Sequence, residues 1–235
     1  MKYRKILILF YLVFISVNLS GQSISDLSLK ICDSIESYHY IESDTVEFKQ
    51  TEIYFKLLKE YMLSQKKLER KSFQRNFNVL NYKLTRELNK TCNSFRVKYT
   101  PPLPLSNLLE IDSIFSDEQS EKINKRTKQI RNKNQLEIVI LSIDDLYPEN
   151  DINEFANKKL VDWNIGKNFE KSGIITVFSK KLRQIRISTT FTSKKYLTDE
   201  NCEKIISEII IPNFKKDNYF DGIYKSLMEI KKIIK

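Results

Sequence analysis

The pair Asp144-Asp145 could do chemistry, because it directly follows an apolar run, residues 136–143, that is typical of a buried strand. In α/β proteins, ligands bind beside the carboxyl ends of the strands, so functional acids are often found there. Aspartate is also favoured in polar turns, where it hydrogen-bonds its own backbone, and a turn is the more common explanation of such a pair. The residues alone make the pair a candidate site without deciding between the two.

Other catalytic signatures are missing from the sequence. It has no Gly-rich phosphate loop, no Cys-x5-Arg motif and no cluster of His and Asp. A phosphatase needs charge stabilisation for the transferred phosphoryl group and either an activated nucleophile or metal ions. His39 is the only histidine and has no ligand partner at metal-binding spacing, so we interpret it as a surface or helix-end residue.

The three cysteines suggest one bond and one free thiol. Cys32 and Cys92 both lie in the first part of the chain, and an oxidising compartment would permit a disulfide between them. In an up-down-up bundle the start of the first helix lies far from the end of the third, so two free thiols remain the alternative. Cys202 lies on an apolar helix face and is predicted to be a buried free thiol.

The first 22 residues have the layout of a secretory signal peptide. Three basic residues within the first five positions precede an apolar run, residues 6–17, and small residues follow at positions 20 and 21. The run is shorter than the roughly 20 residues of a membrane span. We therefore expect cleavage near Gln22, with an uncleaved anchor as the alternative. The mature protein is predicted to be periplasmic or secreted, without a transmembrane segment.

The positive net charge does not predict nucleic-acid binding. Cleavage removes three of the basic residues and lowers the charge from +10 to +7. The remaining lysines, in pairs such as Lys66-Lys67, are scattered and are typical of a solvated surface. Only four glycines are present, which makes an all-β barrel with many tight turns improbable.

A proline cluster divides the chain. Three of the four residues 101–104 are proline, and such a segment is extended, so residues 100–107 are predicted to be a linker. Residues 23–99 are predicted to form a helical region, because apolar residues recur there at helical spacing, typical of a three-helix bundle. The three stripes are Leu27, Ile31, Ile35 and Tyr38; Phe48, Phe55, Leu58 and Met62; and Phe73, Phe77, Leu80, Leu84, Leu88 and Cys92.

Residues 108–235 alternate between helix and strand patterns, which predicts an α/β domain with a mixed sheet and helices on both faces. A helix is expected from the cap Ser116 to about residue 133, a strand at 136–143 and a helix from Asp151. Strands at 173–178 and 182–190 are expected to pair, followed by a helix from Thr198 that closes at Pro212 and a last helix near the end of the chain.

Seven short segments of this second part occur in the order and spacing of a known family. About residues 108–234 resemble the TPM domain family, which includes YgcG-like proteins and is also labelled a phosphatase-type domain. The segments are Ile111-Asp112, Trp163-Asn164-Ile165-Gly166, Lys171-Ser172-Gly173-Ile174-Ile175, Arg183-Gln184-Ile185-Arg186-Ile187, Leu197-Thr198-Asp199, Ile211-Pro212-Asn213-Phe214 and Lys216-Asp217-Asn218-Tyr219.

The resemblance implies an exported or membrane-tethered domain with a sheet between helices. Weak acid phosphatase activity and binding of divalent cations, Ca²⁺ or Mg²⁺, are attributed to some members. Asp112 and Asp199 are the implied metal ligands. Matched position by position, the family's pocket would draw on Asp112, Trp163, Gly166, Gly173, Arg183, Arg186 and Asp199.

Several of these residues also have a structural explanation. Trp163 ends an apolar helical stripe typical of a core, and Gly166 is expected to cap that helix in the left-handed region. Asp199 is a first-turn acid that complements a helix dipole. Arg183 and Arg186 are three residues apart on a predicted strand and would point to opposite faces, so only one would face a common pocket.

One segment departs from the family. Members usually follow the Arg-bearing strand with a glycine-rich turn that ends in Glu, whereas residues 188–195 contain neither glycine nor an acid and end in two lysines. Glycine lets a backbone approach a ligand closely, and a carboxylate coordinates hard cations. This departure favours a non-catalytic cell-envelope module that binds an unidentified protein partner or assists assembly. The alternative is a weak phosphatase that depends on a divalent cation.

Overall fold

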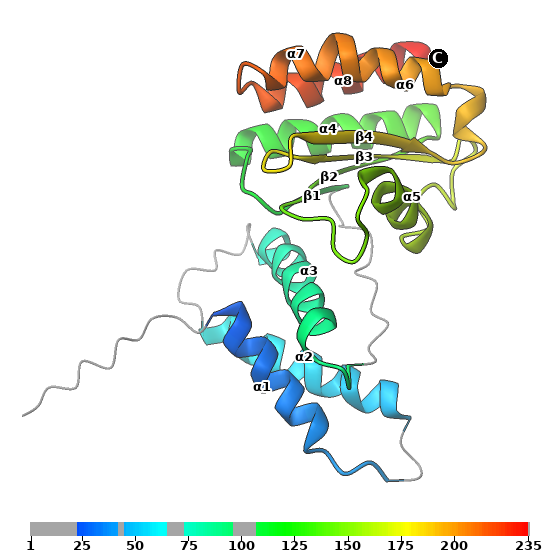
Figure 1. Cartoon of the computed structure of the whole chain (residues 1–235). Helices are drawn as coiled ribbons and strands as arrows, with labels where there is room; N and C mark the ends of the chain where they lie inside the picture. Colours follow the sequence, from blue (N-terminus) through cyan, green and yellow to red (C-terminus); the bar gives the residue numbers. More distant parts are fainter. Residues whose placement is uncertain (1–22, 42–44, 65–72, 96–106, 235) are drawn as a thin grey trace, which may run out of the picture.

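The computed structural model describes residues 23–41, 45–64, 73–95 and 107–234 (Figure 1). The predicted signal peptide and nearly all of the predicted linker lie outside these residues. None of the described helices is both long enough and apolar enough to cross a membrane.

Four strands form one mixed sheet in the order β1-β2-β3-β4. β1 (Leu108–Glu110), β2 (Glu137–Ser142) and β3 (Gly173–Ser179) are parallel, and β4 (Gln184–Thr189) is antiparallel to β3. The short β1 was not predicted, because three residues are too few to show a period. The carboxyl ends of β1, β2 and β3 share one edge of the sheet, called here the carboxyl edge. The opposite amino edge also holds the end of β4.

Helices cover both faces of this sheet. Ile138 and Ile140 of β2 belong to the core formed with α4 (Asp117–Asn134), α6 (Asp199–Lys204) and α8 (Tyr219–Ile233). The alternate residues Val139 and Leu141 belong to the core formed with α5 (Ile152–Asp162). This period of two buries both faces of the strand. The predicted α/β class, a mixed sheet flanked by helices and preceded by a helical region, is confirmed.

The helix that begins at α6 does not close at Pro212 as predicted. It continues as the π-helical η2 (Ile205–Ile210) and α7 (Ile211–Phe214), with Pro212 in the first turn of α7. Proline has no backbone N–H and so cannot complete the ordinary i to i−4 hydrogen bond. The wider turns of a π-helix immediately before it let the chain pass this position without ending the helix.

Three helices form the first part of the chain: α1 (Ile24–Glu36), α2 (Val46–Ser64) and α3 (Phe73–Thr91). Their shared core contains most of the predicted stripes, including Leu27, Leu58 and Leu84. Phe48 is an exception, since 66% of it is exposed. Phe48 lies in the first turn of α2, about 120–180° around the helix from the buried Gln50, Tyr54 and Leu57.

The third helix also contacts the sheet domain. Tyr82 of α3 is 6% exposed and belongs to the core under the β1–β3 face, and Val79 packs against the same core. Leu84 and Leu88, on another side of α3, belong to the core of the helical part. Figure 1 shows α3 lying between α1 and α2 on one side and β1 on the other. α3 is therefore the element that joins the two parts.

Candidate functional site

The carboxyl edge of the sheet collects three aspartates. Asp112 follows β1, and Asp144 and Asp145 follow β2. Because β1 and β2 are parallel neighbours, their ends place these carboxylates side by side, and the charge of Asp144 acts on Asp112. The prediction from Asp144-Asp145 thus concerns the same edge as the family-implied Asp112.

Basic residues of α3 occupy this acidic edge. Arg86 donates to Asp144 through both guanidinium Nη atoms, with Nη2 at 3.2 Å from Oδ2 and Nη1 closer to Oδ1. Arg86 Nη1 also lies 3.4 Å from Asp145 Oδ1, and Lys90 Nζ donates to Asp145 Oδ2 at 3.0 Å. The Arg86 side chain is 14% exposed. The guanidinium and the ammonium neutralise these two partly exposed carboxylates.

The position of these cations follows from helical spacing. Tyr82, Arg86 and Lys90 recur every four residues and so form one stripe of α3. Arg86 lies over the Tyr82 ring at 5.8 Å, and Lys90 lies over the Tyr147 ring at 4.8 Å. The Tyr147 hydroxyl donates to the backbone oxygen of Asn89 at 3.0 Å. Burial raises the pKa of Tyr82, which keeps its phenol neutral.

The pKa values of Asp112 and Asp144 are shifted in opposite directions from the ordinary aspartate value. Burial acts to raise the pKa of Asp144, but the hydrogen bonds and charge of Arg86 outweigh it and hold that pKa below the ordinary value. For Asp112, burial and then the charge of Asp144 raise the pKa. Asp112 Oδ2 is buried and accepts no hydrogen bond from any described residue. Asp112 is therefore the one carboxylate of the three that α3 leaves poorly compensated.

Asp199 lies at the other edge of the sheet. β4 runs antiparallel to β3, so the chain after β4 returns to the amino edge before α6 begins at Asp199. Thr198 caps the helix, and the exposed Asp199 pairs with Lys194 at 2.9 Å. Asp199 thus has the helix-end position expected of it. The two residues implied as metal ligands, Asp112 and Asp199, lie at opposite edges and form no joint site.

Gly166 and Gly173 allow two backbone segments to touch at the amino edge. Gly166 has φ +84°, and a Cβ built on it would lie 2.2 Å from the nitrogen of Gly173. Gly166 N donates to the buried carboxylate of Glu137 at 2.7 Å. The helix before it ends at the C-cap Trp163, and Asn164 takes the first left-handed position, so the prediction that Gly166 caps α5 is wrong by three residues.

Trp163, Arg183 and Arg186 do not share a pocket either. Trp163 is 4% exposed and belongs to the core with α5, and its Nε1 has no partner among the described residues. Arg183 lies in the turn before β4 with φ +53°, so the prediction that both arginines belong to one strand is wrong. Arg186 lies within β4 opposite Val177 and is partly buried.

The segment that departs from the family, residues 188–195, is a folded part of the amino edge. Ser193 Oγ donates to the backbone oxygens of Gly173 and Lys171 at 2.8 and 3.0 Å, and Gly173 N donates to Thr190 Oγ1 at 3.2 Å. These hydroxyls satisfy the backbone where β3 begins. Phe191, by contrast, is 84% exposed, and Lys195 lies over its ring at 5.9 Å.

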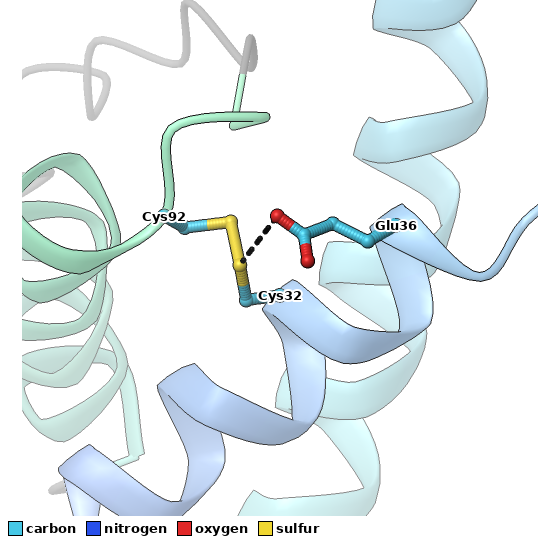
Figure 2. Close-up of side chains that lie close together, drawn as sticks. All are labelled: Cys32, Glu36 and Cys92. Atoms are coloured by element: carbon cyan, nitrogen blue, oxygen red, sulfur yellow. Dashed lines mark hydrogen bonds between the residues drawn. A yellow bond between two sulfur atoms is a disulfide. The ribbon is translucent and has the colours of Figure 1, made fainter.

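One group of potential metal ligands remains among the described residues. Atoms of Cys32, Glu36 and Cys92 lie within 4.8 Å of one another, but the two cysteines form a disulfide (Figure 2). The Glu36 carboxylate lies 3.6 Å from Cys32 Sγ and accepts from Ser94 Oγ at 2.9 Å. Bonded sulfurs have no thiolate to offer a metal. Neither this group nor the acidic edge fits the divalent cation that the family implies.

The Cys32–Cys92 disulfide forms because Cys32 has a different position in its helix from the one that the sequence argument assumed. α1 begins at Ile24, so Cys32 lies in its second half rather than at its start. Ile24 and Leu80 line one small cavity while Cys32 meets Cys92, which shows that α1 and α3 run in the same direction. Because the two helices are parallel, Cys32 near the carboxyl end of α1 lies beside Cys92 at the carboxyl end of α3. Cys202 is free and buried, and burial raises its pKa to about 11.

The sequence reasoning missed Arg86 and Lys90. Both looked like ordinary solvent-exposed residues of a helical stripe, and only their spacing with Tyr82 set them apart. An aromatic and two cations at i, i+4 and i+8 opposite the apolar stripe of α3 were the available signal. The sequence did not indicate that this stripe faces the aspartates.

Comparisons with known proteins found solved structures to which this chain is similar. The solution structure of the N-terminal domain of a P. gingivalis protein is 23% identical, covers 55% of this chain and 81% of its own, and has a TM-score of 0.49. The solution structure of an N-terminal domain from Corynebacterium glutamicum is 11% identical, covers 59% of this chain and 86% of its own, and has a TM-score of 0.46. No curated protein matches the chain.

The family model of the TPM domain matches residues 111–233, which is more than half of the sequence. The match begins directly before Asp112 and ends within α8, and it therefore spans most of the sheet with its covering helices. The chain belongs to the TPM domain family.

Proposed function

We propose that this protein is an exported, non-catalytic module of the cell envelope that binds a protein partner. The observation that carries the proposal is the pairing of Asp144 and Asp145 with cations of the protein itself. Metal-dependent phosphoryl transfer needs carboxylates that are free to hold cations. Here Asp144 and Asp145 hold Arg86 and Lys90 instead, and the second implied ligand, Asp199, lies at the other edge.

Two further features support this role. The Cys32–Cys92 disulfide suits an oxidising compartment, which agrees with export through the predicted signal peptide. The helical part exposes large apolar side chains, of which Leu29, Phe48 and Leu63 are 55%, 66% and 73% exposed. Side chains of this kind can be buried against another protein. We assign partner binding to this helical part.

An activity assay separates the proposal from the alternative, a weak divalent-cation-dependent phosphatase. We expect phosphomonoester hydrolysis at background level with added Ca²⁺, Mg²⁺ or Mn²⁺. Turnover that disappears in Asp112→Asn would establish the phosphatase and overturn the proposal. Turnover that survives both Asp112→Asn and Asp199→Asn would point to a contaminant.

Partner binding is tested by cross-linking in the envelope. A Phe48→Ser, Leu63→Ser double variant should lose a defined cross-linked product that the unchanged protein forms. Val161→Ser is the control, because Val161 is 71% exposed on α5 of the sheet domain. Loss of the product in the control alone would contradict the assignment to the helical part.

A further inference from the structure

A groove of about 520 Å³ opens between two turns at the carboxyl edge of β3. One wall is the turn between β3 and β4, with Lys180 and Arg183, and the other is the turn between α7 and α8, with Lys215 and Asp217. Figure 1 shows both turns at the same end of the sheet. A volume of this size lies within the range of small-ligand sites.

The floor of the groove is apolar and fixed by packing. Ile185, Ile211, Phe214 and Tyr219 line it. The Phe214 and Tyr219 rings lie 4.6 Å apart, and the buried Phe178 supports Phe214 at 5.3 Å. Behind Phe214, a Cβ on Gly222 would come within 2.8 Å of the ring. The rings therefore form a preformed surface, against which a flat or chain-like apolar group loses little freedom on binding.

The rim of the groove carries excess positive charge. Lys180 pairs with Asp217 at 3.6 Å and lies over the Tyr219 ring at 5.0 Å. Within the described part of the chain, neither Arg183 nor Lys215 forms an ion pair. Arg183 is held at φ +53°, and the nitrogen of the preceding Leu182 donates to Ser179 Oγ at 3.1 Å. A non-glycine residue in this region marks a constrained turn, and such residues cluster at ligand sites.

We propose that this groove binds an amphipathic anion. The apolar body lies on Phe214 and Tyr219, and a single carboxylate, phosphate or sulfonate head is bound by Arg183 and Lys215. The apolar floor favours a hydrophobic body, and the two unpaired cations favour one acidic head over a neutral one. All the residues that line the groove belong to the sheet domain, so this proposal does not rest on the proposed protein partner.

Fluorescence titration with 1-anilinonaphthalene-8-sulfonate tests the site on the purified exported chain. We expect saturable binding to one site, displaced by laurate but not by acetate at the same concentration. An Arg183→Ser, Lys215→Ser double variant should bind about tenfold more weakly, the effect of losing about 1.4 kcal/mol. The neutral probe N-phenyl-1-naphthylamine should bind the protein and the double variant equally.

Two further variants complete the test. Lys128→Ser removes an exposed lysine from α4 and should leave probe affinity unchanged. Ile211→Trp, which fills the floor, should abolish binding, with thermal unfolding used to verify that each variant is folded. The proposal is overturned if the unchanged protein shows no saturable binding, if the double variant keeps full affinity, or if laurate fails to displace the probe.

Discussion

Asp112 and Asp144 are neighbouring carboxylates with opposite effects on stability. The raised pKa of Asp112 means that its ionised form is less favourable in the folded than in the unfolded protein. The lowered pKa of Asp144 means the reverse, because Arg86 stabilises its ionised form. At neutral pH both groups are ionised in the unfolded chain, so the two effects are then fully expressed.

We predict that Asp112→Asn raises the melting temperature at pH 7, by roughly 1–3 °C, because it removes a poorly compensated charge while keeping the side-chain shape. The gain should disappear as the pH falls below the ordinary aspartate pKa of about 3.9, where both states are protonated. Asp144→Asn is the matched control and should lower the melting temperature at pH 7. Calorimetry from pH 3 to pH 7 measures both, and a lower melting temperature for Asp112→Asn at pH 7 would contradict the charge argument.

At the scale of elements, α7 and α8 show how packing overrides helix propensity. Alanine normally stabilises a helix interior relative to glycine by about 1 kcal/mol. Gly222 lies in α8, however, and a Cβ there would lie 2.8 Å from Cε1 of Phe214 and 3.3 Å from the Ile210 oxygen. The Phe178 and Tyr219 rings pack against Phe214 and oppose its displacement.

We therefore predict that Gly222→Ala destabilises the protein by about 1–3 kcal/mol, the usual cost of overpacking. Chemical denaturation measures the change. Combined with Phe214→Leu, which removes the ring, the alanine should cost less than it does alone, and this non-additivity identifies the contact. If Gly222→Ala alone stabilises the protein, the Phe214 ring moves aside for the added methyl group and the overpacking argument is wrong.

At the scale of the whole molecule, α3 holds the two parts together through Arg86. We predict that Arg86→Gln lowers the free energy of unfolding by roughly 1–2 kcal/mol, because Asp144 loses a bidentate, charge-assisted partner. The partial exposure of Asp144 keeps this loss below that of a fully buried pair. Arg183→Gln, on an exposed turn, is the control and should change stability little. Equal effects of the two changes, measured in urea, would count against α3 as the connecting element.

The disulfide supports the same arrangement. We predict that replacing Cys32 and Cys92 together by serine lowers stability by about 2–4 kcal/mol, the usual effect of opening a covalent loop of this size. The loss should be concentrated in the helical part, whose core surrounds Cys92. Hydrogen exchange of α1 and α3, compared with that of β2 and β3, measures this distribution. A uniform loss over the whole chain would show instead that the two parts unfold as one unit.

The sequence by itself determined the local elements of this protein. The helix caps at Ser116 and Thr198 and the continuous apolar run of β2 depend on neighbouring residues, and each appears where it was predicted. The ordered family segments likewise determined the TPM assignment, which the family model confirms over residues 111–233. Helix caps and hydrophobic periodicity depend on residues that are close in the chain, so both can be predicted from the sequence alone.

The tertiary structure alone decided which chemistry-bearing residues meet. Asp112 and Asp199 looked like partners in the sequence pattern, but the antiparallel direction of β4 puts them at opposite edges. Arg86 lies 58 residues before Asp144, and only the packing of α3 on the sheet brings the two together. Strand direction and helix docking depend on contacts between residues far apart in the chain. For that reason the sequence predicted the elements, and the fold decided that the acidic edge binds the protein's own cations.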